Sequence, residues 1–168
     1  MASSTPDPDW SRETPTRFWD PARRLLRSIR RYQHWKERGG LLGVLLRRRW
    51  VLSHRFWSVV TGADLPLNCR LGGGLLLPHP NGVVVHPDAV VGNNCLLFQQ
   101  VTLGVRSEGA PVLGHHVDVG AGAKLLGRIV VGDGARIGAN AVVLCDVPAG
   151  QTAVGIPARV IPSSAGDR

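Results

Sequence analysis

One regularity restricts the folds open to this sequence more than any other: from Leu65 to Val143 an aliphatic residue recurs at nearly every sixth position. The anchors of the repeat are Leu65, Leu71, Leu77 and Val83, then Val85, Val91, Leu97 and Leu103, and finally Leu113, Val119, Leu125, Val131, Ile137 and Val143. Gly often follows an anchor directly, and a small or β-branched residue often stands four positions after it. This repeat predicts a solenoid in which each hexapeptide forms one short strand and one tight corner.

Three such strands per coil make a triangular prism, with the anchors pointing toward its axis and the strands of successive coils paired in parallel. We expect the Gly after each anchor to supply an unusual backbone conformation at the corner. The composition fits this fold, because aromatic residues make up only 5% of the chain and glycines number 21, a profile poor in the large side chains of an ordinary packed sandwich. Two breaks in the period predict enlargements, of two residues before Val85 and of four before Leu113.

The first part of the chain follows a different pattern. Leu25, Ile29, Tyr32 and Trp35 are spaced by three and four residues, which is typical of one face of an amphipathic helix. A second helical stretch follows after a Gly-Gly pair, so the two predict a helical hairpin. We therefore expect a disordered lead-in over 1–16, rich in Ser, Thr, Pro and Asp, a basic helical hairpin over 17–61, a β-helix over 62–161 and a tail over 162–168.

The formal charge of +8 belongs to one short region. Residues 17–55 contain twelve Lys or Arg against two acidic residues, so the rest of the chain has a slight negative excess. This distribution weakens a nucleic-acid-binding interpretation of the main domain, and no nucleic-acid partner is expected. A non-enzymatic module in which the basic helices bind nucleic acid, anionic lipid or acidic glycan remains an alternative, although membrane contact is not expected.

Targeting and redox features are few. No apolar run approaches the ~18 residues that a bilayer requires, and the N-terminus lacks the apolar stretch of a signal peptide, so a cytoplasmic location is expected. The cysteines, Cys69, Cys95 and Cys145, are odd in number and form no CxxC pair. We expect buried, reduced thiols and neither a disulfide framework nor a zinc site.

The segment from Asp64 to Ile161 resembles the C-terminal catalytic half of serine acetyltransferases. The likeness rests on LLLPHPNGVVVHPDAVVGNNC, QQVTLG, VGAGAKLLGRIVVGDGARIGANAVVLCDVP and AVGIPARVI. It implies a mainly β fold, the left-handed parallel β-helix, and an acyl-CoA-dependent O-acetyltransferase that uses acetyl-CoA as donor without a metal. The implied acceptor is L-serine, as in cysteine biosynthesis. Because the same group contains sugar and exopolysaccharide acetyltransferases, a sugar or another small hydroxy compound is the alternative acceptor.

The resemblance implies a catalytic pair. His79 falls at the position of the family's catalytic histidine, and an imidazole is suited to take the acceptor's hydroxyl proton near neutral pH. Asp64 falls at the position of the aspartate that orients this histidine. From the residues alone, a solvent-exposed corner residue is the favoured interpretation of His79, and Asp64 could be a cap where the helices meet the solenoid.

The coenzyme site is implied by the same likeness. Ala121 and Ala139 match positions where small side chains let the pantetheine arm lie flat, and basic residues nearby can meet the coenzyme phosphates: Lys124, Arg136 and Arg159. A solvated basic face is the competing interpretation for these three. In this family the coenzyme groove lies between neighbouring subunits, so the resemblance implies a homotrimer in which His79 of one copy works beside the coenzyme positions of the next.

Departures from the family pattern concern the acceptor. Pro78 replaces an aspartate, and Gly109 and Ala110 replace the Arg-His pair of a loop that is about four residues shorter here. Arg106 can substitute for the lost arginine, or it can be an ordinary exposed loop charge. A metal site of the γ-class carbonic anhydrase type is a further alternative on this fold, but the spacing of the histidines does not reproduce the three ligands which that site needs.

Overall fold

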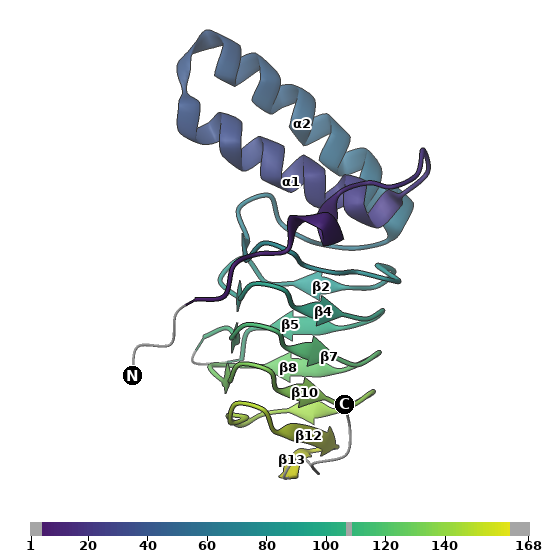
Figure 1. The fold of residues 1–168 in the computed structure, drawn as a ribbon, viewed down its shortest axis with the longest axis vertical. Coiled ribbons are helices and arrows are strands. Elements are labelled where there is room, and N and C mark those ends of the chain that lie inside the picture. The colour runs from purple at the N-terminus through teal and green to yellow at the C-terminus, as the bar shows by residue number, and fades with distance from the viewer. Residues whose placement is uncertain (1–4, 107–108, 162–168) are drawn as a thin grey trace.

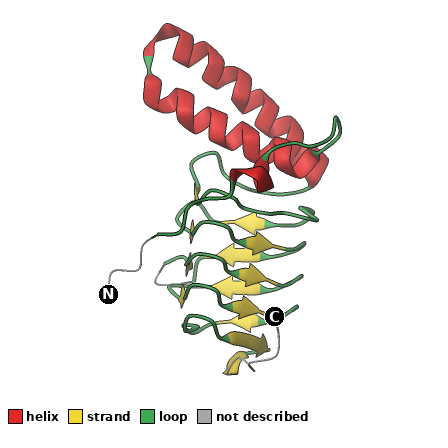
Figure 2. Ribbon diagram, viewed as in Figure 1, coloured by secondary structure: helices red, strands yellow, loops and turns green. Residues whose placement is uncertain are grey.

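The structure is a computed structural model that describes residues 5–106 and 109–161. A three-sided β-helix has a helical hairpin at one end (Figures 1 and 2). A 3-10 helix, η1 (Trp10–Glu13), precedes the hairpin, which consists of α1 (Pro21–Arg38) and α2 (Gly40–Thr61). The strands are β1 (Arg70–Leu71), β2 (Val84–Val85), β3 (Val90–Val91), β4 (Leu96–Leu97), β5 (Thr102–Gly104), β6 (Val112–Leu113), β7 (Asp118–Val119), β8 (Lys124–Leu126), β9 (Val130–Val131), β10 (Arg136–Ile137), β11 (Val142–Val143), β12 (Thr152–Gly155) and β13 (Ala158–Ile161).

The strands form three sheets, one on each side of the prism. The first face has the strand order β1-β3-β6-β9, the second face β4-β7-β10-β12-β13, and the third face β2-β5-β8-β11. Neighbouring strands pair in parallel, except that β12 and β13 form an antiparallel hairpin at the C-terminal end. The predicted mainly β fold, a β-helix preceded by a short helical hairpin, is therefore confirmed.

The hexapeptide anchors fill the interior of the prism. In every two-residue strand the second residue is buried, while the first is exposed or half-buried. Leu97, Leu103 and Leu125, for example, have no exposed surface. Because burial of one such side chain stabilises a protein by roughly 1.5–3 kcal/mol, one anchor per strand supplies a continuous core along the axis.

The glycines that follow the anchors serve a different purpose from the one expected. Gly92 has no positive φ, and a Cβ atom on it would overlap the carbonyl group of Gly114 in the next coil. The left-handed conformation occurs three residues after the anchor, where Gly122 has a φ of 73° and Asn94 and Asn140 have φ values of 61° and 56°. The residue after the anchor is thus small because successive coils approach closely there, and the corner itself uses a later position.

Both predicted enlargements of the repeat lie at corners. Leu76 pairs with Leu96, and Val84 pairs with Thr102, so the turn that contains His79 has two more residues than the turn below it. Val84 pairs with Thr102, and Val90 pairs with Val112. The segment between β5 and β6 is therefore four residues longer than the segment between β2 and β3. Residues 107 and 108 of this longer segment lie outside the described residues.

The N-terminal segment contradicts the predicted disorder over 1–16, because residues 5–20, here called the strap, pack against the first coils (Figure 1). The Glu13 carboxylate is buried, accepts the Leu75 N–H at 3.0 Å and forms an ion pair with Arg30 of α1. Asn94 accepts the Asp9 N–H at 2.7 Å. These few polar contacts depend on residues brought together only by the fold, so composition could not reveal them. Residues 1–4 and the tail over 162–168 lie outside the described residues.

The helical hairpin caps the N-terminal end of the prism. Leu25, Leu26 and Ile29 of α1 are buried in the same core as the first coils. Large apolar residues of α2, such as Leu41 and Leu52, are instead exposed. Across the described ranges no helix combines the length and the apolarity needed to span a membrane.

Candidate functional site

The turns that lead from the second face to the third face stack on one another and form one edge of the prism, here called the site edge. Its turns cover 78–82, 98–100, 120–122 and 138–140. Backbone hydrogen bonds join successive turns: Gly122 N–H donates to the Gln99 carbonyl and Asn140 N–H to the Ala121 carbonyl, each at 2.8 Å. The uppermost turn is the enlarged one, so it projects from the edge beyond the others.

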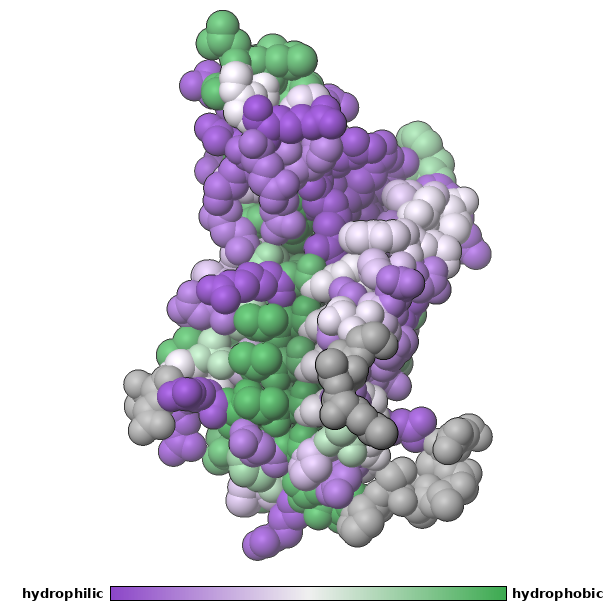
Figure 3. Space-filling model, turned by 60° about the vertical axis from the view of Figure 1, so that its left-hand side comes forward, coloured by the Kyte–Doolittle hydropathy of each residue, from purple (hydrophilic) through white to green (hydrophobic). Residues whose placement is uncertain are grey.

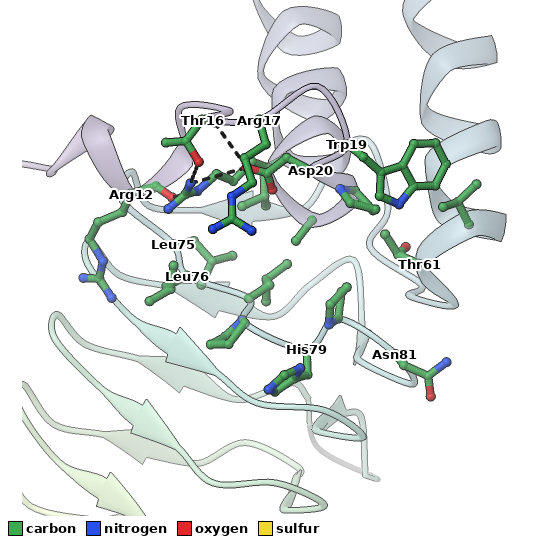
Figure 4. A pocket seen from close by; sticks show the side chains of 18 residues that line it. Arg12, Thr16, Arg17, Trp19, Asp20, Thr61, Leu75, Leu76, His79 and Asn81 are labelled. Atoms are coloured by element: carbon green, nitrogen blue, oxygen red, sulfur yellow. Dashed lines mark hydrogen bonds and ion pairs between the residues drawn. The ribbon is translucent and has the colours of Figure 1, made fainter.

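His79 lies on this enlarged turn, between two prolines that restrict its backbone. Its side chain is exposed on the prism but lines a cavity of about 780 Å³ between the site edge, the strap and the hairpin (Figure 4). The lower wall of the cavity is formed by residues 75–81, and the upper wall by residues from 12 to 26 together with Val60 and Thr61. The volume lies within the range of about 300–1,000 Å³ that is typical of small-molecule sites.

Asp64 is placed on the third face, where its backbone pairs with Val84 beside the enlarged turn. Its side chain is exposed, does not line the cavity and makes no hydrogen bond to His79 or to any other described residue. Asp64 does not cap α2 either, because Gly62 ends that helix with its N–H bonded to the Ser58 carbonyl at 2.9 Å. The predicted catalytic pair is therefore not preassembled in the single chain.

Ala121 and Ala139 lie on the site edge, two and three turns from His79. Since paired strands are about 4.8 Å apart, these two positions are roughly 10 and 15 Å along the edge from the His79 level. Both residues carry only a methyl side chain, and the line along the site edge that joins them is here called the strip. On the turn between them and His79, the side-chain Oε1 of Gln99 is buried and has no hydrogen-bond partner among the described residues.

The three predicted phosphate contacts are distributed around this strip. Lys124 begins β8 on the third face, and its ammonium group donates to the Gln100 carbonyl of the turn above. Arg136 begins β10 on the second face and is exposed. Lys124 and Arg136 thus flank the site edge from its two sides. Arg159 lies farther away, on β13, opposite Val154.

Arg106, the predicted acceptor-binding residue, is at another corner. It lies on the enlarged segment between the third and first faces, where its backbone pairs with Gly109. Arg106 is exposed and does not line the cavity with His79. A single chain therefore does not bring Arg106 to His79.

Sequence reasoning missed the contribution of the strap to the cavity. Arg12, Thr16, Arg17 and Asp20 line its upper wall, opposite His79 (Figure 4). All four come from a Pro-, Asp- and Thr-containing stretch whose composition is typical of disordered termini. The expected boundaries assign residues 17–20 to the hairpin, whereas α1 begins at Pro21, so Arg17 and Asp20 belong to the strap.

The other histidines of the β-helix have structural contacts. His115 Nδ1 accepts the Asn93 N–H at 2.9 Å, and the His115 N–H donates to Asp133. His86 accepts the Asp88 N–H at its own corner. Within the described ranges, no three His, Cys, Asp or Glu side chains gather in a group that could hold a metal ion.

The cysteines divide by burial. Burial raises the pKa of Cys69 and of Cys95 to about 11, whereas Cys145 is exposed. The prediction of buried thiols is therefore right for Cys69 and Cys95, which belong to the core and not to the cavity, and wrong for Cys145.

Comparison with known proteins relates the β-helix to one group of enzymes. No protein-family model matches the chain. A serine acetyltransferase of Synechococcus elongatus is 47% identical over 115 residues, which are 66% of this chain and 47% of that protein. A serine acetyltransferase of Helicobacter pylori (strain J99) is 45% identical over 106 residues, 61% of this chain and 62% of that protein. The chain thus spans about two fifths to three fifths of the length of the curated relatives it matches.

Solved structures agree with this relationship. Serine acetyltransferase from Brucella abortus in complex with coenzyme A superposes with a TM-score of 0.72 at 32% identity, covering 90% of this chain and 62% of that chain. The likeness includes the β-helix and part of the helical region, and it confirms the predicted left-handed β-helix. From its repeat, its fold and these relatives, the chain is a serine acetyltransferase-like member of the hexapeptide-repeat acyltransferase family.

Proposed function

We propose that this protein transfers an acetyl group from acetyl-CoA to a hydroxyl acceptor, with L-serine as the first candidate and His79 as the general base. One observation carries the proposal: the β-helix that is over 40% identical to serine acetyltransferases places His79 on a projecting turn that lines a cavity of about 780 Å³. The coenzyme A complex of the Brucella abortus relative supports acetyl-CoA as the donor.

The chemistry requires one proton acceptor. As the hydroxyl oxygen attacks the thioester carbonyl, the imidazole of His79 takes the hydroxyl proton. The carbon–sulfur bond then breaks, and the imidazolium returns this proton to the departing thiolate. The products are the O-acetyl ester and free coenzyme A, so the base is regenerated in each turnover.

Asp64 is proposed to orient His79 once the site is complete. Its carboxylate is exposed and makes no hydrogen bond to another described residue, on the strand segment that pairs with Val84 next to the enlarged turn. A carboxylate on the second imidazole nitrogen would fix the tautomer and stabilise the imidazolium. Binding of acceptor, coenzyme or a neighbouring copy would supply the contacts that turn Asp64 toward the ring.

For the coenzyme, we propose that the pantetheine arm follows the site edge along Ala121 and Ala139. Support comes from their alignment roughly 10 and 15 Å along the edge from His79. Lys124 and Arg136 flank this strip on the two adjacent faces, where their charges can meet phosphate oxygens. Arg159 lies on β13, and we propose that it contacts the far end of the coenzyme.

A homotrimer is the proposed assembly. The outward side of the first face is apolar below β1, since Val90, Val112 and Val130 occupy register-matched outward positions, with Arg70 of β1 above them. Figure 3 shows hydrophobic residues gathered in a column along this part of the β-helix. If this face of one copy packs against the site edge of the next, repetition around a threefold axis closes the ring and completes each site.

A cytoplasmic location is also proposed, because the buried thiols of Cys69 and Cys95 suit a reducing compartment.

One observation favours an acceptor other than L-serine. Pro78 stands directly before His79 and offers no carboxylate, and Gly109 and Ala110 offer no cation to an acceptor. A sugar or another small hydroxy compound is therefore the second candidate, with the same donor and the same base.

The test is an acetyl-CoA consumption assay that follows free thiol release over a panel of acceptors, including L-serine, L-homoserine and simple sugars. His79→Ala is expected to lower the rate by about 10²- to 10⁴-fold. The matched control is His86→Ala, which removes a corner histidine that does not line the cavity. Full activity of His79→Ala would exclude His79 as the base, and no acceptor-dependent thiol release by the unmodified protein would refute the acetyltransferase proposal.

A further inference from the structure

The upper wall of the His79 cavity is rich in positive charge. Arg12, Arg17 and Arg23 line it together with one acidic residue, Asp20. A cavity wall with such an excess of cations attracts an anionic ligand. Such a ligand needs a charged group that is not already engaged in contacts within the fold.

Two of the three arginines are committed to the fold. Arg12 donates to the carbonyl oxygens of Asn94 at 2.6 Å and Cys95 at 3.4 Å. Arg23 donates to the carbonyl of Arg12 at 2.8 Å and to the side chains of Thr16 and Asp20. Asp20 also accepts the Thr16 N–H, so this carboxylate is already paired with Arg23 of α1 and with the strap backbone.

Arg17 differs from these residues. It has no hydrogen bond or ion pair to any other described residue, although it lines the same cavity as His79. Figure 4 shows the strap above the turn that bears His79, with the Arg17 side chain extending down from the strap into the space between them. An unengaged guanidinium offers a planar pair of N–H donors, which matches the geometry of a carboxylate.

We propose that Arg17 is the specificity-determining residue for the acceptor, and that it binds the carboxylate of a small hydroxy acid whose hydroxyl group is directed to His79. This inference rests on the proposed acetyl transfer and narrows its acceptor to a compound that carries a carboxylate group. It assigns acceptor recognition to the N-terminal strap, not to Arg106, which lies at another corner of the prism.

The experiment compares two acceptors that differ in charge alone at one end, L-serine and L-serinamide. Values of kcat and KM are measured for the full chain and for Arg17→Ala, Arg17→Lys and the control Arg31→Ala, an exposed arginine of α1 outside the cavity. Arg17→Ala is expected to raise the KM for L-serine by about 10- to 100-fold and to leave L-serinamide within about twofold, because only the charged hydrogen bond is lost. Arg17→Lys keeps the positive charge but lacks the paired N–H donors of the guanidinium. It should recover part of the preference for L-serine over L-serinamide.

A binding measurement separates this inference from the proposed function. L-serine is titrated calorimetrically into each variant without acetyl-CoA, and Arg17→Ala should weaken its binding by the same factor. If carboxylate binding depends on Arg17 but no acetyl transfer occurs, the proposed function fails while the anion site stands. Equal effects of Arg17→Ala on both acceptors, unchanged binding, or a preference of the unmodified protein for acceptors without a carboxylate would each overturn the inference.

Discussion

The carboxylate of Glu13 and the guanidinium of Arg30 form a buried ion pair, 2.8 Å between Oε1 and Nη2, that joins the strap to α1 above the first coil. Glu13 is only 6% exposed and also accepts the Leu75 N–H. Arg30 in turn donates to the carbonyl oxygens of Leu71 and Gly72 at 2.5 and 2.6 Å. Neither member lines the cavity, yet together they fix the strap that forms its upper wall.

Removal of one partner should therefore affect stability and acceptor binding together. In Glu13→Ala the Arg30 charge would stay partly buried without its carboxylate, which typically costs about 3–5 kcal/mol. We expect the free energy of unfolding in urea to fall by at least about 2 kcal/mol, and the KM for the acceptor to rise because the strap loosens. Glu37→Ala, at an exposed position of α1, should change neither quantity. Unchanged stability of Glu13→Ala would show that the strap is not anchored by this pair.

The buried cysteines should make stability depend on pH in the alkaline range. Burial raises the pKa of Cys69 and Cys95 from 9.0 to about 11, so these thiols are protonated in the folded state when the unfolded chain already ionises. The protonated thiols contribute fully to the free energy of unfolding below pH 9. This contribution is lost as the pH rises from 9 to 11, and the loss is on the order of 2 kcal/mol per cysteine.

Urea unfolding at a series of pH values measures this decline of the free energy of unfolding between pH 9 and 11. The double variant C69A/C95A should be less stable at neutral pH, because two core side chains become smaller, but its stability should decline less between pH 9 and 11. In native protein at pH 8, a thiol reagent should modify Cys145 rapidly and the other two cysteines only after unfolding. Rapid labelling of all three thiols would contradict their burial.

The proposed trimer makes the first face sensitive to charge. Val112 points outward in β6 and is 41% exposed in the single chain, so Val112→Glu should leave the chain folded. In the assembly this charge would be buried without a partner, so we expect sedimentation analysis to show a shift from trimer to monomer, with loss of acetyl transfer. Val44→Glu, a valine of similar exposure on α2 and away from the β-helix faces, is the matched control. A trimer that tolerates Val112→Glu would place the subunit contact elsewhere.

The β-helix was predictable because its information is local. Each hexapeptide carries its own anchor, and one anchor such as Leu125 is buried in the same way as those above and below it. The two breaks in the period also predicted the enlarged corners, one of which carries His79. The purpose of the glycines was not predictable in the same way, because the close approach of Gly92 to Gly114 exists only between stacked coils.

The features of the candidate site likewise divide into those set by sequence spacing and those set by tertiary packing. The sequence by itself determined the repeat, the position of His79 on an enlarged corner and the alignment of Ala121 and Ala139 along one edge, since a fixed period converts sequence spacing into height on the prism. Only the tertiary structure decided that Arg17 faces His79 across a cavity, that Arg106 does not, and that Asp64 makes no hydrogen bond to the ring. Those relationships depend on how the strap and hairpin pack on the first coil, and they are set by a few long-range polar contacts, such as that of Glu13 with Arg30, which leave no periodic trace in the sequence.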